Sequence, residues 1–136
     1  MGARTKARKR ALDILFESEL RGLPTGASLL DRQAMPDLVL NDYTVRLVEG
    51  VAEHREAIDQ TISAHSTGWS LERMPVVDRN LLRIAVFELR YVDDVPLAVT
   101  LSEAVSLAGE LSTDESSSFV NGVLANIAAA EQSPTG

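Results

Sequence analysis

Apolar residues recur at spacings of three and four along almost the whole chain, and this helical period constrains the fold more than any other feature. It predicts helices over residues 7–20, 38–64, 76–91, 100–111 and 113–130. The stretch 76–91 is apolar over more than half of its circumference, which is typical of a buried central helix. With 136 residues, 45% of them apolar, the chain can bury the core of one compact all-α bundle of five to seven helices.

Turn and capping residues indicate where these helices begin, bend and end. Gly22, Pro24 and Gly26 predict a loop that runs to residue 36 and includes a short helical turn at 28–32. Gly50 is expected to bend or split the second long helix. These breaks separate the helices from one another. Neither the length of the chain nor a change in composition along it indicates a second domain.

Signals near the C-terminus predict how the last two helices begin. Thr100 and Glu103 fit a capping box, so a helix is expected to open there. Acidic residues in the stretch 113–115 are expected in the first turn of the last helix, where the helix dipole favours them. Gly122 lies inside that helix and predicts a close approach by another helix, with Asn121 bonding across it.

The composition excludes several classes of function. The chain has no cysteine, so disulfides, thiolate metal sites and a cysteine nucleophile are excluded. His54 and His65 would stand about 16 Å apart on one helix at 1.5 Å per residue and could not share a metal ion. We therefore expect no enzyme, no catalytic residue, no metal and no cofactor. No apolar run reaches membrane-spanning length and no secretory signal is evident, so we expect a cytoplasmic protein without membrane contact.

A cluster of positive charge at the N-terminus contrasts with an acidic remainder. Five of the 13 basic side chains lie within residues 1–10, which contain no acid: Arg4, Lys6, Arg8, Lys9 and Arg10. The rest of the chain holds eight basic and 20 acidic residues. The five cations surround a helical axis, so we expect either a mobile arm or a helical extension that stands clear of the core. Such an arm would bind phosphates, although a solubilising tail is the alternative.

Four motifs in fixed order resemble the transcription antitermination factor NusB family. They are LRIAVFEL from Leu82, DVP from Asp94, SEAVSLA from Ser102 and FVNGVL from Phe119, and the basic start followed by ALDILFE also fits. The resemblance implies a helical fold in which the first helix packs between two small sub-bundles. It also implies binding to the boxA element of nascent RNA together with the ribosomal protein NusE, within an antitermination complex on RNA polymerase.

The resemblance also implies which residues make these contacts. Members of the family would bind RNA through positions that here are Arg4, Lys6, Arg8, Lys9, Arg10, Phe16, Glu115 and Phe119. The NusE-facing surface would include Glu72 and Asp78, with Arg79 and Arg83 as weaker candidates. Ser118, in a run of three serines at 116–118, stands before Phe119 where relatives can place a cation, so one phosphate contact is expected to be missing.

Together these observations predict a basic arm at 1–10, one helical RNA-binding domain at 11–131 and a disordered tail at 132–136. Two other functions stay open at this point. The chain could be an acidic helical adaptor that binds only proteins, or the RNA-binding part of a ribosomal RNA methyltransferase without its catalytic domain. The oligomeric state is also open, since a homodimer could bury the apolar or basic face.

Overall fold

Helices account for all the regular secondary structure in the computed structural model, which describes residues 2–132. Their bounds are α1 Ala3–Leu20, α2 Leu29–Gln33, α3 Asp42–His65, α4 Val76–Tyr91, α5 Leu97–Leu111 and α6 Ser116–Gln132, with a 3₁₀ turn, η1, at Leu71–Arg73. No strand occurs within 2–132. The prediction of an all-α fold with five to seven helices is confirmed.

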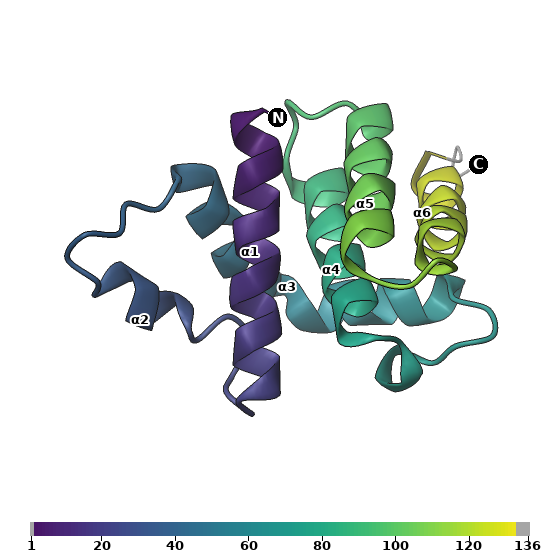
Figure 1. Cartoon of the computed structure of the whole chain (residues 1–136). Coiled ribbons are helices and arrows are strands. Elements are labelled where there is room, and N and C mark those ends of the chain that lie inside the picture. Colours follow the sequence, from purple (N-terminus) through teal and green to yellow (C-terminus); the bar gives the residue numbers. More distant parts are fainter. Residues whose placement is uncertain (1, 133–136) are drawn as a thin grey trace.

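The first helix stands between two groups of helices, as the resemblance implied (Figure 1). On one side lie α2, its flanking loops and the first part of α3, and on the other lie α4, α5 and α6. Ser28 ties the α2 side to α1, because its hydroxyl donates to the carbonyl oxygen of Ile14 at 3.0 Å. The long helix α3 runs beneath both groups and joins them.

Helix α4 forms the centre of the core, as its apolar pattern predicted. Every residue from 80 to 88 is buried, including the polar residues Asn80, Arg83 and Glu88. Leu82 and Val86 have no exposed surface. Burial of each large aliphatic side chain of this kind contributes about 1.5–3 kcal/mol to folding, so α4 is the element around which the others pack.

Gly50 has a different role from the predicted one. Helix α3 continues through it, and the departure from helical dihedrals comes four residues later at His54, with φ −106° and ψ 15°. A side chain at Gly50 would overlap the ring of Phe87, so the glycine makes room for an aromatic ring of α4. The imidazole of His54 stacks on Tyr91 with ring centroids 4.0 Å apart.

Three predictions about α5 and α6 are wrong. Helix α5 begins at Leu97, so Thr100 lies inside it and its buried hydroxyl faces Glu88 instead of capping the helix. Helix α6 begins at Ser116, so the acidic residues of 113–115 precede its first turn. A side chain at Gly122 would meet nothing within 4 Å, and Asn121 is exposed, so no helix approaches there.

Two further observations concern membrane-spanning helices and the C-terminal end of the chain. Among the described residues, no helix combines the length and the apolar character needed to cross a membrane. Gln132 is the last residue of α6. The rest of the predicted disordered tail, residues 133–136, lies outside the described part of the chain.

Candidate nucleic-acid and partner interface

The basic N-terminal segment is the start of α1 and does not stand clear of the core. The helix runs without interruption across the predicted arm boundary at residue 10. Arg8 is only 3% exposed. Its guanidinium donates to both carboxylate oxygens of Glu88, at 3.0 and 3.1 Å, and to Glu103 at 2.8 Å. Arg8 therefore holds α1 against α4 and α5, and the expectation that it lies free for RNA phosphates is wrong.

Glu88 is the buried anion at the centre of this contact. Its carboxylate is 1% exposed and also accepts a short hydrogen bond from the hydroxyl of Tyr43 on α3. Burial, followed by this hydrogen bond and the nearby negative charge, raises the pKa of Tyr43, so the phenol stays protonated as the donor. One carboxylate of α4 thus joins this helix to α1 and α3, and partners from those two helices compensate the cost of burying it.

Two other cations of the segment form ion pairs at the surface. Arg4 donates to Asp94 at 3.1 Å and lies over the ring of Tyr43, with its guanidinium carbon 4.3 Å from the ring centroid. Lys9 contacts Glu110 at 2.7 Å. The hydrogen bond from Arg4 lowers the pKa of Asp94. All four side chains are well exposed, and surface pairs of this kind are worth roughly 0–1 kcal/mol, so a phosphate can compete for either cation.

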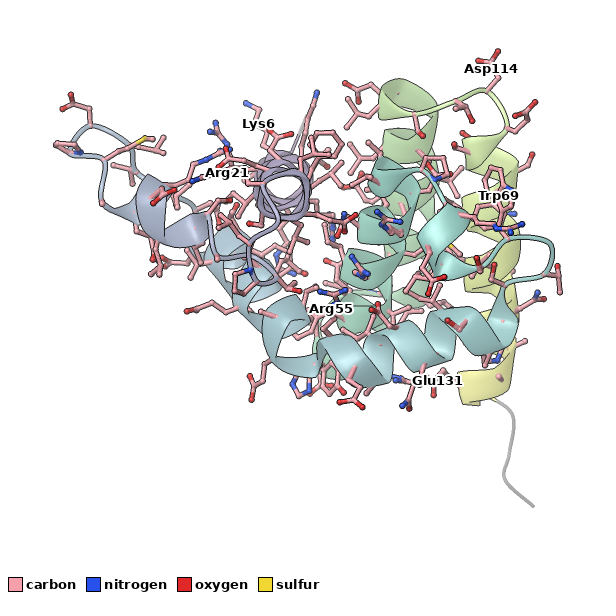
Figure 2. All side chains as sticks on the ribbon, turned by 90° about the horizontal axis from the view of Figure 1, so that it is seen from below. Lys6, Arg21, Arg55, Trp69, Asp114 and Glu131 are labelled. Carbon is pink, nitrogen blue, oxygen red and sulfur yellow. The ribbon has the colours of Figure 1, made fainter. Side chains whose placement is uncertain are left out.

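Lys6 and Arg10 are the exposed cations of this segment that form no ion pair with any residue in 2–132. They lie four residues apart, one turn along α1, and Figure 2 shows Lys6 projecting from the helix away from the body of the protein. Both line a groove of about 220 Å³ between α1 and the start of α3, together with Leu40 and Thr44. The positive charge available to a ligand is therefore concentrated at these two side chains.

Phe16 lies three turns further along α1 than Lys6 and is half-buried. At 100° per residue it projects close to Lys9 and within about 80° of Lys6, so a ring and two cations share one side of the helix. The ring is not part of the hydrophobic core cluster. This arrangement could hold a base beside the phosphates that bind the lysines.

The start of α6 carries the other two expected RNA contacts. Glu115 is exposed just before the helix, and its carbonyl oxygen accepts from the amide of Phe119 at 3.0 Å. Phe119 is half-buried and packs edge-on against Trp69, with ring centroids 5.0 Å apart. Trp69, which is 37% exposed, is not among the contact residues expected from the sequence.

The expected partner-binding residues divide between a cleft and the interior. Glu72, Arg79 and Arg83 line a cleft of about 430 Å³, whose walls come from η1, α4, the end of α1 and the middle of α3. Glu72 is exposed, and its side chain makes no ion pair within the described residues. It is therefore the member of the set that is free to meet a partner.

The two arginines of the cleft are held by internal carboxylates. Arg83 is 3% exposed and bonds Glu19 at 3.0 Å and Asp59 at 2.8 Å, while Arg79 makes a short bond to Glu19. Partial burial raises the pKa of Glu19, but the hydrogen bonds from the two arginines outweigh this effect and lower it. These arginines join α1, α3 and α4 and form the floor of the cleft.

Asp78 is buried, so the expectation that it forms part of the partner-facing surface is wrong. Its side chain is fully buried in the first turn of α4. It accepts a hydrogen bond from the hydroxyl of Ser112 at 2.6 Å, and Ser112 in turn accepts from Ser116 at 3.0 Å. The carboxylate thus ties α4 to the turn between α5 and α6, the turn that presents Glu115.

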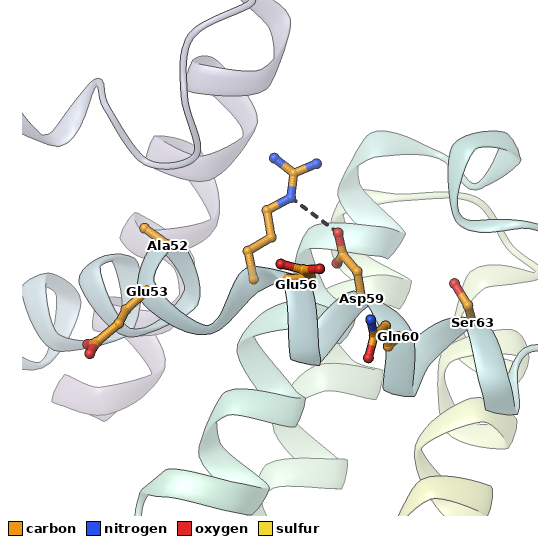
Figure 3. A pocket seen from close by; sticks show the side chains of 7 residues that line it. Ala52, Glu53, Glu56, Asp59, Gln60 and Ser63 are labelled. Carbon is orange, nitrogen blue, oxygen red and sulfur yellow. Dashed lines mark hydrogen bonds and ion pairs between the residues drawn. The ribbon is translucent and has the colours of Figure 1, made fainter.

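Another hollow lies along the outer side of α3 (Figure 3). Its volume is about 750 Å³, and residues of α3 alone line it, among them Glu53, Glu56 and Asp59. Arg55 in its wall pairs with Asp59 at 3.2 Å. Within residues 2–132 no group of three His, Asp or Glu side chains is placed to hold a metal ion. The residues that line this acidic, one-sided hollow include no cation besides the engaged arginine.

Comparison with known proteins agrees with these features. The model of the NusB family matches residues 5–129. The transcription antitermination protein NusB of Acidothermus cellulolyticus is 56% identical over 135 residues, covering 99% of this chain and 93% of that protein. A structure of Thermotoga maritima NusB superimposes with a TM-score of 0.82 at 34% identity, covering 93% of this chain and 91% of the other. NusB in a crystal structure of the antitermination factors NusB and NusE with double-stranded RNA gives a TM-score of 0.77 at 28% identity, covering 93% and 96%. The chain belongs to the NusB family of transcription antitermination proteins, which are not enzymes.

Proposed function

We propose that this protein binds the boxA element of nascent RNA together with NusE, and that the pair acts within the antitermination complex on RNA polymerase. The observation that carries the proposal is the pair of unpaired, exposed cations Lys6 and Arg10 on α1 of an otherwise acidic protein. A related NusB has been crystallised with NusE and RNA, which supports the same set of partners here. The work would take place in the cytoplasm, where nascent transcripts are found.

The cations differ in the part they can play. Lys6 and Arg10 are free to neutralise phosphates, and Arg4 and Lys9 can exchange a weak surface pair for one. Arg8 is committed to Glu88 and Glu103 and would act only through the position of α1. Phosphate contacts bring affinity without sequence preference, so the sequence would be read by Phe16, Phe119 and Glu115.

The cleft around Glu72 is the surface that we assign to NusE. Its rim carries a free carboxylate, and the adjacent hollow of α3 adds Glu53 and Glu56. Ribosomal proteins are basic, and opposite charge accelerates encounter and fixes orientation. Arg79 and Arg83 would support the surface from beneath without contacting the partner through free donors.

A titration of labelled single-stranded boxA RNA, with and without NusE and between 50 and 200 mM salt, tests this function. We expect affinity to fall steeply with salt and to rise when NusE is present. Glu72→Lys should weaken the effect of NusE and leave RNA binding alone unchanged. Glu131→Lys is a matched reversal on α6, away from the cleft, although it also removes a surface pair with Arg90.

Two results would contradict the proposal. Failure to bind boxA RNA at low salt in the presence of NusE would leave a protein-only adaptor as the better reading. The second result is a homodimer whose formation displaces the RNA, because the basic face would then be buried between two copies of the protein. Sedimentation at several protein concentrations, with and without RNA, distinguishes these cases.

A further inference from the structure

We propose that Trp69 and Phe119 together form a niche that holds one unpaired RNA base, and that Trp69 is a specificity-determining residue of the RNA site. This inference rests on the proposed RNA-binding function and adds a residue to it. The two rings meet at an interplanar angle of 65° with centroids 5.0 Å apart. Rings set at this angle form two walls of a corner, so a base can stack on one face while its edge meets the other ring.

The loop before α4 is built to present Trp69. Gly68 has φ +94°, a conformation that favours glycine, and it turns the chain just before the tryptophan. The hydroxyl of Ser66 donates to the carbonyl oxygen of Trp69 at 2.7 Å and closes the loop. Figure 2 shows the side chain of Trp69 beside α6. The ring is therefore fixed next to Phe119 and is not a free-swinging loop residue.

Trp69 keeps binding capacity that the fold does not use. Trp69 is 37% exposed, so part of its ring surface is open to a ligand. Its indole N–H donates to no residue in 2–132, although a tryptophan donor usually finds a partner when it is packed. An exposed face and an unused donor are what a base and its ribose or phosphate would occupy.

Charge indicates that the occupant is a base held by stacking. The chain contains no lysine or arginine after Arg90, so α5 and α6 supply no cation for a phosphate. Acidic residues and serines precede Phe119 instead. The basic side chain nearest to Trp69 in sequence is the exposed Arg73 of η1. RNA that contacts α6 itself must then be held by rings and hydrogen bonds, and the carboxylate of Glu115 can accept from the amino group of a base. Stacking of one base on an aromatic side chain changes affinity about 5- to 150-fold.

The only tryptophan of the chain makes the test direct. We expect boxA RNA to quench the tryptophan fluorescence of the native protein. A series of boxA RNAs, each lacking the base of a different nucleotide, locates the contact. Only the RNA that lacks the base held by the niche should fail to quench the fluorescence. Trp69→Leu should weaken RNA binding about 5- to 150-fold with an unchanged salt slope, and Trp69→Phe should recover most of the loss. Leu30→Ala, which removes a 70% exposed side chain on α2, is the control and should bind like the native protein.

The outcomes separate this inference from the proposed function. If the native protein binds boxA RNA but neither its fluorescence nor the affinity of Trp69→Leu changes, the niche is refuted and the proposed function stands. If Trp69→Leu weakens binding of NusE but not of RNA, the niche is a protein contact and the inference is wrong. If the native protein binds no RNA, the proposed function itself fails.

Discussion

Replacing Arg8 by methionine separates the cation that holds the fold from the cations that are free for RNA. The substitution keeps an apolar stem of similar length and removes the guanidinium. Glu88 then keeps Tyr43 and a long contact of 3.4 Å to Thr100, while its own carboxylate stays 1% exposed. The Glu88 carboxylate of this variant would lack its positively charged partner and would still be shielded from solvent.

The expected cost follows from this burial. Removing one partner of a buried ion pair costs about 3–5 kcal/mol, because the other charge is left uncompensated. In a chain of this size each kcal/mol lowers the Tm by roughly 3–5 °C, so Arg8→Met should melt about 10–20 °C below the native protein. Adding Glu88→Gln should recover part of the loss, because it removes the orphaned charge.

The double variant Lys6→Ala and Arg10→Ala removes the two free cations and leaves Arg8 in place. Both side chains are exposed and unpaired among the described residues, so each change should alter stability by about 0.5 kcal/mol or less. If both cations bind phosphates, the salt slope for single-stranded RNA should fall by about 1.4, at about 0.7 per contact. Thermal melts followed by circular dichroism, and RNA titrations at several salt concentrations, measure the two effects separately.

One pattern of results would refute this reasoning. It is an Arg8→Met protein that melts within about 2 °C of the native one, at a Tm precision below 1 °C, yet shows a salt slope reduced by about 0.7, the value for one phosphate contact. Arg8 would then be a phosphate ligand, and its contact with Glu88 would contribute little to folding.

Glycine and carboxylate substitutions test other parts of the structure. Gly50→Ala should destabilise the protein by about 1–3 kcal/mol in urea melts, because the added methyl overlaps the ring of Phe87; an unchanged midpoint would show that the ring moves aside freely. Gly122→Ala should stabilise the protein by about 0.5–1 kcal/mol, because the new methyl meets open space and removes backbone freedom from the unfolded chain. A lower stability of this variant would contradict the open space around residue 122. The pKa of Glu19 is lowered from its ordinary value of 4.5, so its stabilisation is present above that pH and is lost as the pH falls through the folded pKa. Glu19→Gln should therefore lower stability at pH 7 and flatten its decline as the pH falls below about 5, whereas Glu56→Gln, at an exposed position, should change stability at pH 7 by about 0.5 kcal/mol or less.

The helices could be predicted because their signals are local. Periodicity identified α1, α3, α4, α5 and α6, and it identified α4 as the central helix. One error came where side chains that look like a local cap make distant contacts. Thr100 and Glu103 have capping-box spacing, yet in the fold they face Glu88 and Arg8. A pattern four residues long does not contain that information.

The site was harder to predict for the same reason. The basic segment looked unneutralised because its acidic partners lie 80–101 residues away in sequence: Asp94, Glu88, Glu103 and Glu110. Trp69 gave no local signal, since its importance comes from its position beside Phe119. Asp78 was placed on the partner-facing surface by the resemblance alone, whereas in the fold it is buried and Ser112 donates to one of its oxygens. Which charges are free can be determined only after the helices are packed.

The bond between Arg8 and Glu103 also orders events during synthesis of the protein. The two residues are separated by 95 positions, and Glu88 by 80, so the first helix leaves the ribosome long before its acidic partners have been translated. Until then its cations remain exposed to any polyanion nearby, including ribosomal RNA. Final docking of the N-terminal helix must therefore follow translation of α4 and α5, and a nascent chain that stalls before residue 88 cannot bury Arg8 in this way.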